Sequence, residues 1–235
     1  MTEQEWLDAS DPRRMLEILR KIRKVSNRKL RLFAVACCRH IWPLLCDDAS
    51  RRAVQVAERF ADGLANSEHL SAALEALLKT LRVRGAQNSA LVASVYAAVD
   101  EGVVPGRPSG HVQNESMFDE GANFHAAADL AAWHAARSAQ GKAFKRQQKL
   151  QSSSLRDIAG NPFRPKPVFE PAWRAPGVLA LAREMYNSGT FNRMPALADA
   201  LQAAGCTDDD ILRHCRVPTA HARGCWVVDL ILNRE

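Results

Sequence analysis

The chain has 235 residues, of which 47% are hydrophobic and 25% are charged, and its formal net charge at pH 7 is +6. This balance is typical of a folded soluble protein and excludes a chain that is disordered throughout. No apolar run approaches the roughly 20 residues needed to cross a bilayer, and the acidic start at residues 1–5 does not resemble a signal peptide. We therefore expect a cytoplasmic protein with no membrane partner and with six reduced cysteines.

The first hundred residues predict a series of amphipathic helices. Asp11 and Pro12 pair an N-cap residue with proline at the first helical position, and the helix expected over about 28–45 is apolar over most of its girth. Apolar residues at 3.6-residue spacing continue the pattern, with further helix starts at Asp47 or Asp48, Ser67 and Gln87. Starts near 12, 49 and 87 resemble the period of stacked helical hairpins, which we keep as an alternative arrangement.

The second half of the chain predicts helices interrupted by two irregular segments. Prolines and glycines at 102–120 indicate a long loop, and an alanine-rich helix is expected from about 122 to 150, with an interruption or cap at residues 152–154. Residues 160–167 hold three prolines and cannot be helical. Later helices are expected to start at Pro176, at Pro195, after the N-cap Thr207 and at Gly224.

These patterns predict an all-α fold of about nine to eleven helices in a single multi-helix domain. We expect an N-terminal half at 1–101, a loop at 102–120, and a C-terminal half at 121–235 that packs with the first half. No alternation typical of β-strands appears in the first half.

Basic residues gather near the start of the chain, where nine Lys or Arg residues stand against a single acidic residue, Glu17, between Pro12 and Arg31. Such a face can bind nucleic acid or an acidic protein, although it is more often a solvated helix surface. The candidate anion-binding residues are Arg13, Arg20, Lys21, Arg23, Lys24, Arg28 and Lys29. A second basic run lies at 142–149.

The last thirty residues hold the densest group of chemistry-bearing side chains. The candidate cluster comprises His214, Cys215, His221, Arg223, Cys225, Trp226 and Asp229. Thiolate and imidazole are the ligands that zinc prefers, which makes Cys206, His214, Cys215, His221 and Cys225 candidate ligands. The close Cys-x-x-Cys pair of most structural zinc sites is missing.

A reactive cysteine is a second interpretation of this cluster. Cys225 is expected in the first turn of a helix, near His221 and Arg223, where the helix dipole and cations lower a thiol pKa. Asp229 can then orient a base. The third interpretation is packing, with Cys225 and Trp226 facing inward and with Arg223 and Asp229 as polar anchors. We expect the third, with no cofactor, no structural metal and no disulfide.

Three groups of sequence strings resemble a known family. EWLDASDPRRMLEILR, KLRLFAVACCRHIW and RRAVQVAERFADG resemble the N-terminal signature of an uncharacterised all-helical bacterial family. SLRDIAGNPFRP resembles its central signature, and GCTDDDILRHCR with HARGCWVVDLIL resembles its C-terminal one. The resemblance implies kinship and supplies no activity.

For function, the sequence predicts a non-catalytic helical module that binds an unidentified protein partner, because no glycine-rich phosphate loop or catalytic constellation is recognisable. The alternative is nucleic-acid binding through the face at Arg13–Arg31, which would be weak, indifferent to sequence and sensitive to salt. A Cys/His-dependent enzyme or a zinc-stabilised protein is the remaining alternative.

Overall fold

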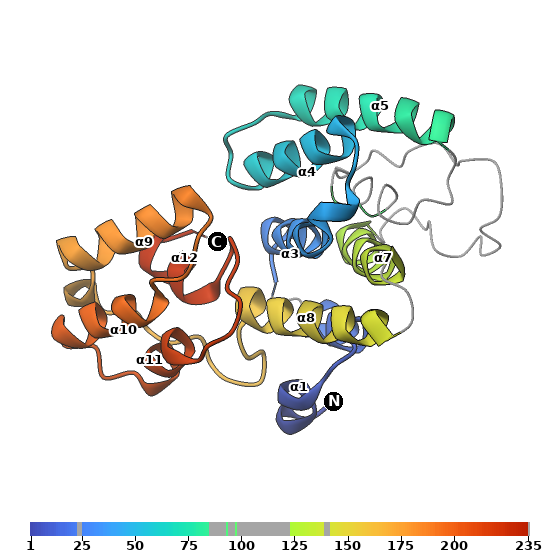
Figure 1. The fold of residues 1–235 in the computed structure, drawn as a ribbon. Coiled ribbons are helices and arrows are strands. Elements are labelled where there is room, and N and C mark those ends of the chain that lie inside the picture. Colours follow the sequence, from blue (N-terminus) through green and yellow to red (C-terminus); the bar gives the residue numbers. More distant parts are fainter. Residues whose placement is uncertain (23–24, 85–92, 94–96, 98–122, 139–141, 235) are drawn as a thin grey trace.

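The computed structural model describes residues 1–22, 25–84, 93, 97, 123–138 and 142–234. This part of the chain contains eleven α-helices, two short 3-10 helices and no strand (Figure 1). The predicted all-α class and the predicted number of helices are therefore confirmed. The helix expected from Gln87 lies largely outside the described residues, as does the loop expected at 102–120. No described helix is both long enough and apolar enough to span a bilayer.

The first five helices follow the sequence signals closely. They are α1 (Glu3–Asp8), α2 (Pro12–Ile22), α3 (Asn27–His40), α4 (Asp48–Ala61) and α5 (Ser67–Arg84), with the 3-10 helix η1 (Trp42–Leu44) before α4. The capping box of α1 is present, since the Thr2 hydroxyl accepts from the Glu5 N–H at 3.2 Å and the Glu5 carboxylate accepts from the Thr2 N–H at 2.7 Å. Asp47 caps α4.

Helix α3 is the centre of the first hydrophobic core. It contacts α4, α7 (Asn123–Ser138) and α8 (Lys142–Ala159), and its residues 30–38 are all buried. A helix with neighbours on all sides must be apolar around most of its girth, as the sequence indicated. The core runs from Trp6 to Ile158 and includes side chains of α2, α3, α4, α5, α7 and α8.

Two details of this half differ from the sequence-based expectation. Two helices stand in place of the single helix expected over 122–150. Helix α7 ends at Ser138 and α8 begins at Lys142. Residues 152–154 lie inside α8 and do not interrupt the helix. Ser152 and Ser154 are buried, and the Ser154 hydroxyl lies 3.3 Å from Nε2 of His40 on α3. Their small side chains permit close helix packing, which outweighs the weak helix propensity of serine.

A second hydrophobic core is built from residues 169–231. Its elements are the 3-10 helix η3 (Pro171–Trp173) and the helices α9 (Pro176–Ser188), α10 (Met194–Ala203), α11 (Asp209–Arg216) and α12 (Trp226–Leu232). The proline-rich segment before η3 has no regular structure, as predicted. The N-cap of α11 is Asp208 and not Thr207, because its carboxylate accepts the N–H groups of Asp210 and Ile211, each at 3.0 Å.

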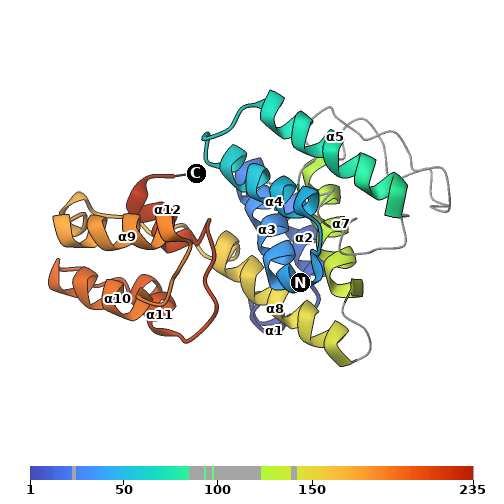
Figure 2. The same cartoon turned by 45° about the horizontal axis from the view of Figure 1, so that its top comes forward.

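Among the described residues, the first core ends at Ile158 and the second begins at Phe169, because α7 and α8 pack with the N-terminal helices. Figures 1 and 2 show α9–α12 as one group of helices beside the larger group, with the C-terminal end of α8 directed towards it. We call the region where the two groups of helices meet the joint. Gly224 lies at the joint with a φ of +89°, and a Cβ added to it would lie 2.9 Å from Cδ1 of Leu32. Only glycine allows α3 and the C-terminal segment to approach so closely.

Candidate functional site

The structure divides the candidate anion-binding residues into separate groups. Arg13, Arg20 and Lys21 lie exposed on α2, and the guanidinium of Arg13 stacks 5.7 Å from the ring centroid of Trp133. Arg23 and Lys24 lie outside the described residues. Arg28 and Lys29 on α3 are enclosed at the joint between the two cores, so they do not belong to an exposed face as the sequence analysis expected.

Arg28 and Lys29 are held by buried carboxylates. Nη1 of Arg28 donates to Oδ2 of Asp229 at 2.7 Å, and its Nη2 donates to Oδ1 of Asp62 at 3.1 Å and to the Tyr186 hydroxyl at 2.6 Å. Burial alone would lower the pKa of Arg28, but the hydrogen bond and charge of Asp229, together with Tyr186 and Asp62, outweigh burial and raise that pKa. Nζ of Lys29 donates to the carbonyl of Ile158 at 2.8 Å. Arg28 and Asp229 therefore tie α3 to α12.

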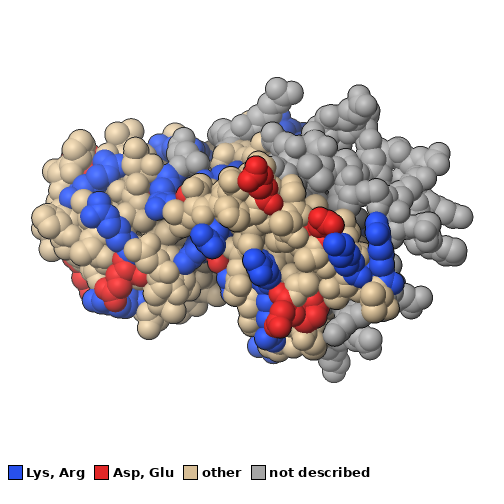
Figure 3. Space-filling model, turned by 90° about the horizontal axis from the view of Figure 1, so that it is seen from above, with Lys and Arg blue, Asp and Glu red and all other residues tan. Residues whose placement is uncertain are grey.

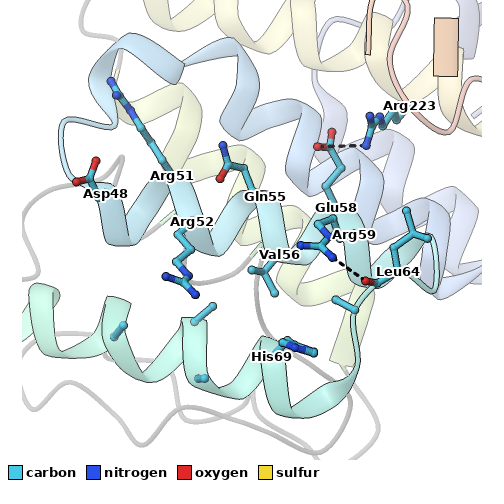
Figure 4. Close-up of a pocket in the computed structure, with 14 residues that line it drawn as sticks. Asp48, Arg51, Arg52, Gln55, Val56, Glu58, Arg59, Leu64, His69 and Arg223 are labelled. Atoms are coloured by element: carbon cyan, nitrogen blue, oxygen red, sulfur yellow. Dashed lines mark hydrogen bonds and ion pairs between the residues drawn. The ribbon is translucent and has the colours of Figure 1, made fainter. Parts of the chain in front are cut away.

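A broad groove along the exposed side of α4 gathers arginines from two parts of the chain. We call it the arginine groove; it has a volume of about 960 Å³. Helix α5 forms one wall and Arg223 lies at the far end (Figure 4). Its lining comprises Asp48, Arg51, Arg52, Gln55, Val56, Glu58, Arg59, Leu64, Ala65, His69, Ala72, Ala73, Ala76 and Arg223.

The groove retains unused donors on its arginines. Arg52 is exposed, forms no hydrogen bond or ion pair with other described residues, and points from α4 towards α5, whereas Arg51 points to the other side of α4 (Figure 4). Within the described structure, the buried Nε atoms of Arg51 and Arg223 have no hydrogen-bond partner. Glu58 is already shared, at 2.7 Å from Nη2 of Arg39 and 3.6 Å from Nη1 of Arg223.

The C-terminal cluster includes one residue that the sequence analysis did not identify, Asp157 on α8. His214 lies on α11, His221 lies in the segment between α11 and α12, and Cys225 is the N-cap of α12. One ligand atom from each of the four residues lies within 4.8 Å of the ligand atoms of the other three. Asp157 was missed because it is 57 positions from the nearest partner; the only signal was a carboxylate between apolar positions of a helix.

The contacts within this cluster are short. Oδ1 of Asp157 lies 2.6 Å from Nδ1 of His221 and 3.1 Å from Nε2 of His214. Sγ of Cys225 lies 3.2 Å from Nε2 of His214 and 3.9 Å from Nδ1 of His221. The backbone N–H of Ala222 donates to the second Asp157 oxygen at 2.9 Å. These contacts tie α8 to the C-terminal segment.

The electrostatics of the cluster disfavour a reactive thiol. Burial raises the pKa of Cys225 well above its ordinary value, and the negative charge of Asp157 raises it further. Such a thiol is protonated at neutral pH and is a poor nucleophile. Burial would also raise the pKa of Asp157, but hydrogen bonds from His214 and His221 outweigh burial and lower that pKa to about 2.

The other candidate residues are buried in the second core or make contacts that anchor the C-terminal segment. Cys206 and Cys215 are buried in the second core, outside the four-residue cluster, and burial raises the pKa of Cys215 to about 12. The indole N–H of Trp226 donates to Nδ1 of His214 at 3.1 Å. Arg223 donates to the Asn187 carbonyl at 2.9 Å, so Arg223 and Asp229 both anchor the C-terminal segment.

Comparisons of the chain with protein-family models, with curated proteins and with solved structures find no match.

Proposed function

We propose that the protein is a helical interaction module that binds an acidic, amphipathic segment of a protein partner in the arginine groove. The observation that carries this proposal is the exposed guanidinium of Arg52, which points from α4 towards α5 and has no partner among the described residues, with the exposed Arg59 also in the groove lining. Guanidinium groups form paired hydrogen bonds with carboxylates, so two exposed arginines in one groove favour a ligand that carries carboxylates.

The apolar part of the lining favours a peptide. Leu64 is 62% exposed at one edge of the groove, and Val56 and the alanines of α5 contribute further apolar surface. An amphipathic helix places apolar and acidic side chains on different sides, and grooves between helices bind such segments through apolar anchors. Apolar contacts with Leu64 and ion pairs with Arg52 can then form together.

The charge distribution favours this occupant over nucleic acid. The lining includes the carboxylates of Asp48 and Glu58 among its arginines, so the groove is not an unbroken cationic track. On the face seen in Figure 3, Lys and Arg are interspersed with acidic and uncharged residues and form no continuous basic surface. A duplex or single strand binds best to an unbroken cationic track, which single-strand binders combine with stacking aromatics.

Selection from a displayed library of random 16-residue peptides tests the proposal with the full-length protein as bait. The selected peptides should be enriched in Asp and Glu and in helical apolar spacing, and Arg52→Glu should weaken their binding at least tenfold. Arg183→Glu is the matched control, since Arg183 is exposed on α9 outside the groove. It should leave binding within twofold.

Two results would refute the proposal. One is a selection that yields no acidic enrichment, or peptides that bind the Arg52→Glu protein as tightly as the unaltered protein. The other is tight binding of a labelled duplex or single strand that is abolished by Arg20→Glu with Lys21→Glu and is unaffected by Arg52→Glu. That second result would assign function to the exposed basic face of α2.

A further inference from the structure

Four side chains of the types that bind zinc converge where the two cores meet. Asp157 comes from the end of α8, His214 from α11, His221 from the following segment and Cys225 from the start of α12. Their ligand atoms all lie within 4.8 Å of one another. The sequence alone argued against a metal, because the cysteines lack the usual close pair. The fold supplies the missing ligand from a distant helix.

The spacing of these atoms fits a tetrahedral ion. Zinc bonds of about 2.0–2.3 Å place neighbouring ligand atoms about 3.3–3.7 Å apart. The two Asp157–histidine separations are 2.6 and 3.1 Å, and the two Cys225–histidine separations are 3.2 and 3.9 Å. These four values lie on both sides of the tetrahedral range, and no pair of the four ligand atoms is more than 4.8 Å apart.

Hydrogen bonding alone does not account for the position of Cys225. A thiol is a weak donor and a weak acceptor. Its Sγ nevertheless lies 3.2 Å from Nε2 of His214, a nitrogen that also lies 3.1 Å from Asp157. A shared role as metal ligands explains why a thiol, a carboxylate and two imidazoles approach the same point.

The charges of the four groups match a divalent cation. Asp157 is fully buried within the cluster, and the side chain of His221 is only 3% exposed. With Cys225 as thiolate and Asp157 as carboxylate, two negative charges cancel the charge of the ion. One sulfur, two nitrogens and one oxygen are a zinc set, whereas magnesium and calcium require oxygen ligands.

We propose that Asp157, His214, His221 and Cys225 bind one structural zinc ion that joins the two cores. Four protein ligands complete a tetrahedron and leave no position for a substrate. Asp157 is next to Ile158 of the first core, and Cys225 belongs to the second core. The ion therefore holds α8 against the C-terminal segment. This inference goes beyond the proposed peptide binding and does not depend on it.

Zinc binding moves three protons. His221 donates from Nδ1 to Oδ1 of Asp157 at 2.6 Å in the metal-free protein, so coordination through Nδ1 moves that proton to Nε2. The Cys225 thiol loses its proton to solvent, so one proton is released for each ion bound. His214 is neutral in both states. In the metal-free protein Nδ1 accepts the indole N–H of Trp226 at 3.1 Å, so the imidazole proton is on Nε2. Coordination through Nε2 transfers that proton to Nδ1, and the indole must then turn away. Trp226 is thus a reporter of the bound ion.

Elemental analysis of protein purified without added metal is the first test. We expect one zinc per chain, and removal of the ion by a chelator should lower the melting temperature by roughly 10 °C. Readdition of zinc should restore the melting temperature. Less than a tenth of an equivalent of zinc, no binding on addition of zinc to the chelated protein and no change in melting would overturn the proposal.

Cobalt titration of the metal-free protein identifies the ligands even where a variant is destabilised. The unaltered protein should show the charge-transfer absorption of a cobalt–thiolate bond, and Cys225→Ser should lose it. Cys215→Ala and Cys46→Ser are matched controls, because Cys215 is buried outside the cluster and Cys46 is exposed. Both should keep the absorption. Loss with Cys215→Ala and retention with Cys225→Ser would contradict the assignment.

Three further readouts separate coordination from a packing role. Asp157→Asn and His221→Ala should each weaken zinc affinity at least tenfold. The zinc dissociation constant should fall about tenfold for each unit of rising pH below the thiol pKa, because one proton is released. The indole N–H resonance of Trp226, assigned with Trp226→Phe, should shift on zinc binding. An unchanged resonance in the zinc-loaded protein would exclude His214 as a ligand.

Discussion

The two hydrophobic cores are stabilised in different ways. The first is built from helices of up to 18 residues that surround α3, and most of its contacts are apolar. The second is built from α9 and from shorter helices, including α11 with 8 residues and α12 with 7. Helices this short do not persist alone in water, and a core of this size supplies little net stability.

The smaller core therefore depends on its contacts with the larger one. Arg28 of α3 reaches Asp229 of α12 and Tyr186 of α9, and Asp157 of α8 reaches His214 and His221. These polar ties are buried at the joint. The comparison indicates that the joint, and not the interior of the second group, is where that group gains its stability.

Breaking the Arg28 tie should have the largest effect. Arg28→Ala leaves the nearly inaccessible carboxylates of Asp62 and Asp229 without their main cation, and removal of one partner of a buried pair costs about 3–5 kcal/mol. The free energy of unfolding from urea titration measures the loss. Hydrogen exchange should show α9–α12 opening before α3.

An exposed ion pair within the second group is the control for this variant. Arg193 pairs with Glu184 at 2.6 Å, with side chains 48% and 59% exposed. Arg193→Ala should cost about 1 kcal/mol or less, because solvent screens exposed pairs. Equal losses for Arg28→Ala and Arg193→Ala would contradict a dependence on the joint.

Local signals in the sequence predicted the helices well. The prolines at the starts of α2 and α9 lie where the pattern placed them. Errors arose where burial outweighed propensity, as with Ser152 and Ser154 inside α8. The choice of Asp208 over Thr207 as N-cap of α11 was also beyond the sequence, because both are favourable cap residues.

The site was harder to predict because its residues are distant in the chain. Arg28 and Asp229 are 201 positions apart and form one ion pair. A run of basic residues indicated an exposed face, yet Arg28 lies on the enclosed side of α3 and neutralises a carboxylate. The grouping of His214, His221 and Cys225 was visible in the sequence, but Asp157 joins them only through tertiary packing.

Closing the space at Gly224 should have the second largest effect. In Gly224→Ala the new Cβ would lie 2.9 Å from Cδ1 and 3.2 Å from Cβ of Leu32, at a φ of +89°. Steric overlap and the left-handed backbone together should cost about 2–4 kcal/mol. Gly63→Ala is the matched control, since its φ is +70° and nothing lies within 4 Å of the added Cβ.

The difference between these two variants measures the close approach alone. Gly63→Ala should cost about 1 kcal/mol, which is the backbone term. Urea unfolding of both variants under one set of conditions gives the comparison. If Gly224→Ala is no less stable than Gly63→Ala, the packing at the joint can adjust to a methyl group at little cost in free energy. The stability of the second group would then depend less on the joint.

Acid should weaken the first core through His134 of α7. Burial, together with the nearby charges of Arg137 and Arg13, lowers the pKa of His134 to about 4. The unfolded chain takes up this proton near pH 6.5. Stability is therefore full above pH 6.5 and falls between pH 6.5 and 4, by up to about 2 kcal/mol after allowance for partial exposure.

The variant His134→Gln isolates this contribution, because glutamine does not titrate. Urea unfolding from pH 7 to 4 should show a smaller decline for His134→Gln than for the unaltered protein. Parallel pH profiles for the two proteins would mean that the acid sensitivity lies elsewhere. Hydrogen exchange in α3 and α7 then reports whether the first core opens at low pH.

The smallest effect is expected at the surface tie between the same two groups of helices. Arg164, in the irregular segment between the cores, lies 2.5 Å from Glu3 of α1 and 2.8 Å from Asp210 of α11. Its side chain is 43% exposed, and those of Glu3 and Asp210 are 37% and 39% exposed. Water and salt therefore weaken both ion pairs.

Arg164→Ala removes a tie between the same two groups of helices as the Arg28 tie, but one that is exposed and not buried. Its urea midpoint should stay close to that of the unaltered protein, and any difference should shrink as sodium chloride is raised, because exposed pairs are screened. The loss in Arg28→Ala should persist in salt, since its carboxylate partners are nearly inaccessible. A salt-resistant loss in Arg164→Ala as large as that in Arg28→Ala would show that connection between the groups, and not burial of the charges, determines stability at the joint.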